Sequence, residues 1–168
     1  MLQSPNSWAL SEGFFSQWAD LERFDNIAID ETQHIVFNSG IRESARLEVQ
    51  HFFDTMFKEN LSLTTLIDSN FIVINDLLAF HYGLELPNAN AGFQKVSLPA
   101  GVSRGGLLGM TAFLTMGSNG ERSSPIIRGA LVMEKFLNRK PSPPPPNVPE
   151  LALASEKPLA VKEIIDLH

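Results

Sequence analysis

The clearest pattern in the chain is a helical repeat of apolar residues across positions 41–60. Apolar side chains recur there every three or four residues, and most polar side chains fall on the opposite face. Burying each apolar side chain contributes roughly 1.5–3 kcal/mol, which predicts a core helix rather than a cofactor site. The apolar face comprises Ile41, Ala45, Val49, Phe52, Phe53, Met56 and Phe57, and the polar face comprises Arg42, Glu43, Arg46, Gln50, Asp54 and Lys58.

Weaker helical patterns lie on both sides of this segment. Residues 8–24 carry an aromatic stripe at spacings of three and four, which predicts one amphipathic helix followed by a connecting loop up to residue 40. Ser62 is placed to cap a short helix over residues 63–68. Asn75 is a second cap, before a helix over residues 76–82 that Gly83 should end.

A small β element is indicated between these helices. Residues 71–74 read Phe-Ile-Val-Ile, a β-branched run typical of an extended strand. Residues 93–98 alternate between apolar and polar side chains. We expect the two segments to pair.

The last third of the chain combines a glycine-rich turn, a marked helix start and a proline run. Residues 107–116 predict a buried helix entered through Gly105 and Gly106, whose lack of a side chain favours close packing. Ser124 and Pro125 predict the start of a helix that runs to about residue 138. Residues 141–149 predict a polyproline II rod, and residues 159–167 a final helix. The candidate core positions of the helix that begins at Pro125 are Ile126, Ile127, Ala130, Leu131, Phe136 and Leu137.

These elements predict a mainly α protein, with a helical bundle-like domain, a minor β element and a C-terminal polyproline segment. The boundaries that we expect are a helical domain over residues 1–98, a small helical domain with the proline rod over residues 99–150, and the start of a further domain over residues 151–168. Both ends have the character of cut sequence, which predicts a fragment of a larger protein.

Composition narrows the classes of partner. The net charge is −6 and no cluster of Lys and Arg stands out, so nucleic acid and anionic membranes are poor candidates. No apolar run approaches the ~20 residues that a membrane span needs. The chain has no cysteine, which excludes disulfides, thiolate metal sites and covalent haem attachment within it.

Two longer motifs are distinctive in combination: Asn75-Asp-Leu-Leu-Ala-Phe-His-Tyr-Gly83 and Ser123-Ser-Pro-Ile-Ile-Arg-Gly129. Shorter ones accompany them at residues 14–18, 21–24, 48–57, 66–68, 104–108, 147–149 and 161–168. Together these motifs resemble the uncharacterised helical domains that accompany c-type haem modules in large secreted proteins of the planctomycete type. The resemblance implies a periplasmic or extracellular, redox-associated parent protein whose haem c is held in a separate module. It carries over no catalytic residue.

The best candidate contact site is the start of the helix at Pro125. Its backbone N–H groups and the guanidiniums of Arg122 and Arg128 suit a carboxylate, a phosphate or a haem propionate, with Asn119 and Ser124 beside them. Alternatively, the arginines pair with the chain's own carboxylates or with carbonyls of the proline segment and pin the loop.

Among the four histidines, His81 is the candidate ligand, since histidine serves as an axial haem ligand. The alternative is a helix-end histidine that bonds to the last carbonyls of its helix. No His pair has the i, i+4 spacing of a helical metal site, so we predict no metal in this chain.

We identify no catalytic constellation in the sequence. We therefore expect a structural or interaction domain of a secreted, c-type-cytochrome-linked protein, whose partners are other domains of the same polypeptide. The alternative is the substrate-binding part of an extracytoplasmic haem-linked oxidoreductase, which would need His81 close to Arg122 and Arg128. Whether the protein is an enzyme stays open at this level.

Overall fold

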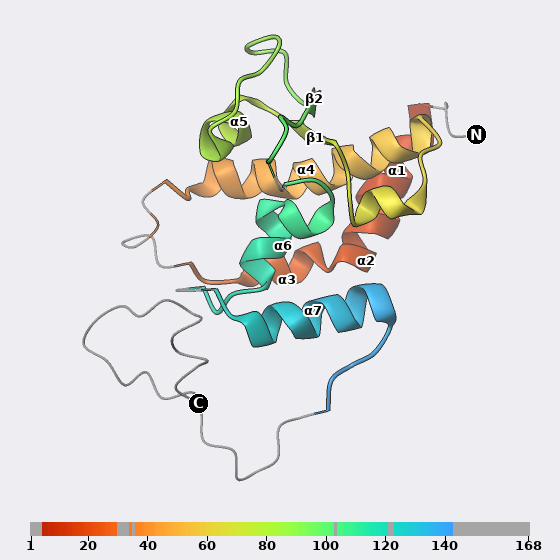
Figure 1. Cartoon of the computed structure of the whole chain (residues 1–168), viewed down its shortest axis with the longest axis vertical. Coiled ribbons are helices and arrows are strands. Elements are labelled where there is room, and N and C mark those ends of the chain that lie inside the picture. The colour runs from red at the N-terminus through yellow and green to blue at the C-terminus, as the bar shows by residue number, and fades with distance from the viewer. Residues whose placement is uncertain (1–4, 30–33, 35, 103, 121–122, 143–168) are drawn as a thin grey trace.

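A computed structural model describes residues 5–29, 34, 36–102, 104–120 and 123–142. Its long helix α4 (Ser39–Lys58) forms the centre, with α5, β1 and β2 on one side and α6 and α3 on the other, while α7 lies farthest away (Figure 1). The remaining α-helices and strands are α1 (Trp8–Leu10), α2 (Ser16–Ala19), α3 (Leu21–Asn26), α5 (Asp76–Tyr82), α6 (Thr111–Met116), α7 (Pro125–Leu137), β1 (Phe71–Ile74) and β2 (Gln94–Ser97). Short 3-10 turns cover Pro5–Ser7, Leu63–Leu66 and Leu107–Gly109, and a π-helical turn covers Ser11–Phe15.

The predicted fold class is confirmed: the described chain is mainly helical with one two-stranded antiparallel sheet. Phe71 pairs with Ser97 and Ile74 with Gln94, so the expected strand pairing is present. All four residues of β1 are buried because α4 packs against the sheet. The core draws on both sides of the domain boundary predicted at residue 98, through residues such as Phe52, Ile74 and Phe113.

The predicted caps form as expected from local chemistry. The side chain of Asn75 accepts a hydrogen bond from the Leu78 N–H, and Gly83 ends α5 at φ 67°. Asn38 caps α4 in the same way through the Ile41 N–H. Ser62 caps the turn over Leu63–Leu66.

The first helix is broken, contrary to the prediction of one helix over residues 8–24. Asp20 adopts a left-handed conformation at φ 61°, which ends α2 and starts α3 in a new direction. Asp tolerates this region better than most residues. The break lets Phe15, before it, stack on Phe53 while Leu21 and Phe24, after it, are fully buried.

The glycine-rich turn explains how α6 reaches the core. A Cβ on Gly105 would lie 1.7 Å from the Ser69 carbonyl oxygen, and one on Gly106 would lie 2.5 Å from the Ile67 oxygen. Only glycine lets these two backbones touch. The prediction of close packing at these glycines is therefore confirmed, although Met110 interrupts the predicted helix between its 3-10 turn and α6.

Two predicted faces are wrong in part. On α4, Gln50 and Asp54 are buried, because Gln50 donates to Ser16 Oγ at 2.8 Å and Asp54 pairs with Lys58. On α7, Leu131 is the only buried residue, whereas Ile126 and Leu137 are 64% and 60% exposed. The predicted proline rod beyond residue 142 and the helix over residues 159–167 lie outside the described residues.

Candidate functional site

A group of interacting ionisable side chains centres on Glu48 of α4. Glu48 is completely buried, because it lies three residues after Ala45 and four before Phe52, on the apolar face of its helix. Burial raises the pKa of its carboxyl to about 8, against the lowering effects of a hydrogen bond from Tyr82 and the charge of Arg104. At neutral pH the carboxyl is therefore mostly protonated.

A short hydrogen-bond chain joins this carboxyl to two other helices. The Tyr82 hydroxyl, at the end of α5, donates to Glu48 Oε2 at 2.6 Å. The same hydroxyl accepts the backbone N–H of Thr111, the first residue of α6, at 3.1 Å. Burial, together with the nearby Glu48, raises the pKa of Tyr82 well above its usual value. The chain thus ties α4, α5 and α6 together at one point.

Arg104 covers this cluster from the loop before α6. Its guanidinium carbon lies 4.1 Å from the centre of the Tyr82 ring, a cation–π contact, and its Nη1 donates to the Gly109 carbonyl at 3.4 Å. Glu48 Oε1 is buried and has no hydrogen-bond partner among the described residues. The arrangement holds a proton away from water, which suits a structural lock better than an open reaction site.

His81 lies next to this cluster. Its ring contacts Phe37 edge-on, with centroids 6.3 Å apart, and Tyr82. Its pKa is lowered from the usual value by partial burial and by the charge of Arg104. A neutral imidazole is the form that ligates metals. A group of three or more His, Cys, Asp or Glu side chains suited to a metal is absent from the described part of the chain.

The predicted contact site lies at the start of α7. Ser124 is its N-cap and accepts the Ile127 N–H at 3.3 Å, so the predicted helix start is confirmed. Arg128 Nη2 donates to Ser123 Oγ at 3.5 Å, while its buried Nε has no partner among the described residues. Asn119 is exposed in the adjoining loop, beside the bridge between Ser118 and Ser123. Arg122 lies outside the described residues.

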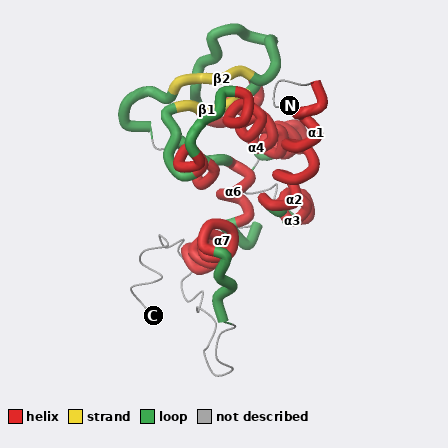
Figure 2. The backbone as a smooth tube through the Cα atoms, turned by 90° about the vertical axis from the view of Figure 1, so that its right-hand side faces the viewer, coloured by secondary structure: helices red, strands yellow, loops and turns green. Residues whose placement is uncertain are grey.

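The structure does not bring His81 beside Arg128. His81 belongs to α5, on one side of α4, whereas Arg128 belongs to α7, at the far end of the molecule (Figure 1). The view turned by 90° also places α7 well away from α4 and the sheet (Figure 2). The two candidate groups are separate features.

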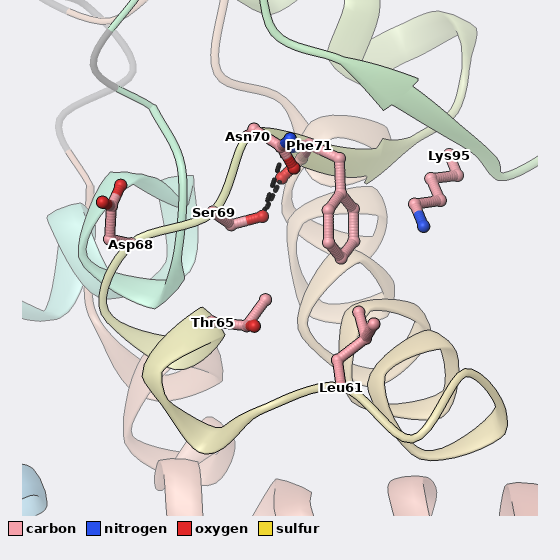
Figure 3. A pocket seen from close by; sticks show the side chains of 7 residues that line it. All are labelled: Leu61, Thr65, Asp68, Ser69, Asn70, Phe71 and Lys95. Atoms are coloured by element: carbon pink, nitrogen blue, oxygen red, sulfur yellow. Dashed lines mark hydrogen bonds between the residues drawn. The ribbon is translucent and has the colours of Figure 1, made fainter.

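A polar hollow of about 410 Å³ opens beside β1 (Figure 3). Its polar groups are largely committed to the fold. Ser69 Oγ donates to the Phe71 carbonyl at 2.8 Å and accepts the Phe71 N–H, and Lys95 pairs with Glu59 over the Phe71 ring. The lining residues are Leu61, Thr65, Asp68, Ser69, Asn70, Phe71 and Lys95, and none of the predicted site residues is among them.

Sequence interpretation missed the Glu48 cluster, although a signal was present. A carboxylate at position 48 falls on the apolar stripe between Ala45 and Phe52, where an ionised group would be costly to bury. Tyr82 lies outside that stripe, so its pairing with Glu48 follows only from the packing of α5 on α4.

Of three comparisons with known proteins, the one with protein families matches two parts of the chain. Residues 1–84 match the family described as PSD4: Protein of unknown function (DUF1592), and residues 104–168 match PSCyt3: Protein of unknown function (DUF1588). Both family labels denote domains associated with cytochrome c. Neither a curated protein nor a solved structure matches the chain. In the described residues, no helix is both long and apolar enough to cross a membrane. Because the first match covers half of the 168 residues, the chain belongs to the DUF1592 family of proteins of unknown function.

Proposed function

We propose that this chain is a structural and interaction domain of a secreted, c-type-cytochrome-linked protein, and that it holds a haem module and a following domain in fixed positions. The observation that carries the proposal is the sealed state of the Glu48 cluster. Glu48 is 0% exposed, and its partners are the chain's own Tyr82 and, through it, Thr111. A group that acts on a substrate has to contact it, whereas the buried Glu48 carboxyl joins helices α4, α5 and α6.

The contact surface in this proposal is the start of α7 together with the proline run. Arg128 supports this role, because its guanidinium makes one long hydrogen bond to Ser123 and its Nε is unpaired in the described structure. A carboxylate of a neighbouring module, or a haem propionate, would complete its hydrogen bonding. The residue is also beside Gly117, whose missing side chain leaves room for the arginine stem.

Cross-linking of the complete parent protein tests the proposal. We expect Lys140, exposed just after α7, to cross-link to the haem module, while Lys95 on β2 does not. Arg128→Glu should reduce the Lys140 cross-links severalfold without lowering the melting temperature by more than a few degrees, because the residue is half-buried at the surface. Haem-module cross-links from Lys95 but not from Lys140 would contradict the contact surface.

The oxidoreductase alternative requires His81 beside Arg122 and Arg128, but His81 and Arg128 lie apart, so a variant at the Glu48 cluster next to His81 is its remaining test. The two functions differ in what Glu48→Gln does. A structural lock predicts that electron transfer to and from the haem module is unchanged in a variant that still folds. Loss of turnover with the fold intact would favour the enzyme.

A further inference from the structure

Helix α7 carries its polar side chains inward and much of its apolar surface outward. Lys135 is 13% exposed and reaches Asp20 at 3.6 Å, and Arg128 is held between Ser123 and Gly117. The opposite side of the same helix shows Ile126, Met133 and Leu137 to solvent, with Gly129 between them. An amphipathic surface helix keeps its apolar residues on the core side, as α7 does with Leu131, and does not show a second apolar side to solvent.

The outward residues form a continuous stripe. Positions 126, 129, 133 and 137 are three or four residues apart, so they line one side of the helix over ~16 Å, at 1.5 Å per residue. The stripe carries no charge. Exposed apolar residues scattered singly need no explanation, but a continuous apolar face marks a contact surface. In Figure 1 the other helices and both strands lie on one side of α7.

We propose that the chain's own residues 159–167 bind this outward face of α7. Their sequence, Leu-Ala-Val-Lys-Glu-Ile-Ile-Asp-Leu, has apolar residues at 161, 164, 165 and 167 with the polar residues 162, 163 and 166 between them. That spacing gives a helix an apolar stripe of ~9 Å, which covers a little over half of the ~16 Å stripe on α7. The match to a single family over residues 104–168 contains both α7 and this segment, so the two belong to one family unit.

The connecting chain is long enough for this contact. From Asn138 to Pro158 there are 21 residues, 138 through 158 inclusive. The proline run over residues 141–149 spans up to ~28 Å at 3.1 Å per residue, more than the ~20 Å length of α7. The segment can therefore lie alongside α7 in either direction.

Charge favours the segment as well. Arg139 and Lys140 follow α7 and are exposed. Residues 143–168 carry more acidic than basic side chains: the acidic ones are Glu150, Glu156, Glu163 and Asp166, and the basic ones are Lys157 and Lys162.

A second copy of the chain is a poorer occupant of this face. One helix face is small beside the ~800 Å² per partner of a stable interface, whereas a tethered segment binds at an effective concentration in the millimolar range.

Engineered cysteine pairs test the contact directly, because the 168-residue chain has no native cysteine. Met133→Cys would be combined in turn with Val161→Cys, Ile164→Cys and Ile165→Cys. A disulfide needs the two Cα atoms within ~7 Å, so we expect rapid intramolecular oxidation of at least one pair, seen as a faster-migrating monomer on a non-reducing gel. The matched control is Leu77→Cys, which is somewhat more exposed than Met133 (47% against 37%) but lies on α5, and which should oxidise with the same partners at least tenfold more slowly.

A second measurement does not depend on disulfide geometry. Replacing Ile164 and Ile165 together by Asp should expose the α7 stripe and raise the binding of a hydrophobic dye severalfold, while Glu163→Gln should leave it unchanged. Three results would overturn the proposal: disulfide-linked dimers in place of the intramolecular bond, equal oxidation of the Leu77→Cys control, or dye binding that the double substitution does not alter.

Discussion

Gly105→Ala is expected to destabilise the protein by roughly 3 kcal/mol or more. The added Cβ would lie 1.7 Å from the Ser69 carbonyl oxygen and 2.7 Å from its carbonyl carbon. These are backbone atoms that also position Phe71 at the start of β1, so the neighbour cannot simply turn aside. Unfolding in urea, followed by far-ultraviolet circular dichroism, measures the effect as a fall in the midpoint.

Gly129→Ala is the matched control for this prediction. Gly129 lies within α7, and a Cβ there would meet no heavy atom within 4 Å. Because alanine loses less backbone entropy than glycine in a helix, this variant should gain about 0.4–1 kcal/mol. Equal stability changes in the two variants would show that the turn at Gly105 can relax, and that close approach to Ser69 does not hold α6 in place.

The sequence was sufficient where structure depends on neighbours along the chain. The cap at Asn75, the stop at Gly83 and the start at Ser124 each depend on one side chain and the backbone within three residues of it. The β1–β2 pairing was also predicted, because its strands alternate or are β-branched and no other strand competed. Long, regular α4 was predicted within two residues at each end.

The predictions failed where the structure depends on contacts between residues far apart in the sequence. Asp20 breaks the first helix because the two halves must reach different parts of the core, and its own chemistry only permits the break. Periodicity identified apolar positions on α7, but it cannot say which of them face the core. The orientation of α7 depends on contacts such as the ion pair between Lys135 and Asp20, which the pattern of apolar residues does not predict. The burial of Gln50 has the same origin, since Ser16 comes from a separate helix.

The candidate site shows both limits. Local geometry was enough to predict the helix start at Ser124, four residues before Arg128, but the proximity of His81 that an enzyme would need depends on tertiary contact. Glu48 could have been singled out as a carboxylate in an apolar stripe. Its partners could not, because Tyr82 is 34 residues away along the chain.

Stability should fall as pH rises from about 4.5 to about 8. The carboxyl of Glu48 has its pKa raised from 4.5 to about 8 by burial, so the folded state holds a proton that the unfolded state releases over this range. Each pKa unit corresponds to about 1.4 kcal/mol, which sets the fall at up to about 5 kcal/mol. Above pH 8 both states are ionised and the loss is complete. Urea unfolding at pH 5, 6, 7 and 8 would measure it.

Comparison with Glu48→Gln isolates this contribution. Gln keeps an acceptor for the Tyr82 hydroxyl but cannot ionise, so the stability of the variant should not show the fall, and the variant should become more stable relative to wild type as pH rises. His51 and His81 act in the opposite direction, because burial lowers their pKa values and the protein loses stability as pH falls below about 6.5. Wild type and variant share this effect, so it cancels in the difference between their stabilities. Glu43→Gln, an exposed position on the same helix, should follow the wild-type curve. If the stabilities of wild type and Glu48→Gln changed in the same way from pH 5 to 8, the Glu48 carboxyl would have to be hydrated or paired with a cation. The buried contact that joins α4, α5 and α6 would then not exclude water.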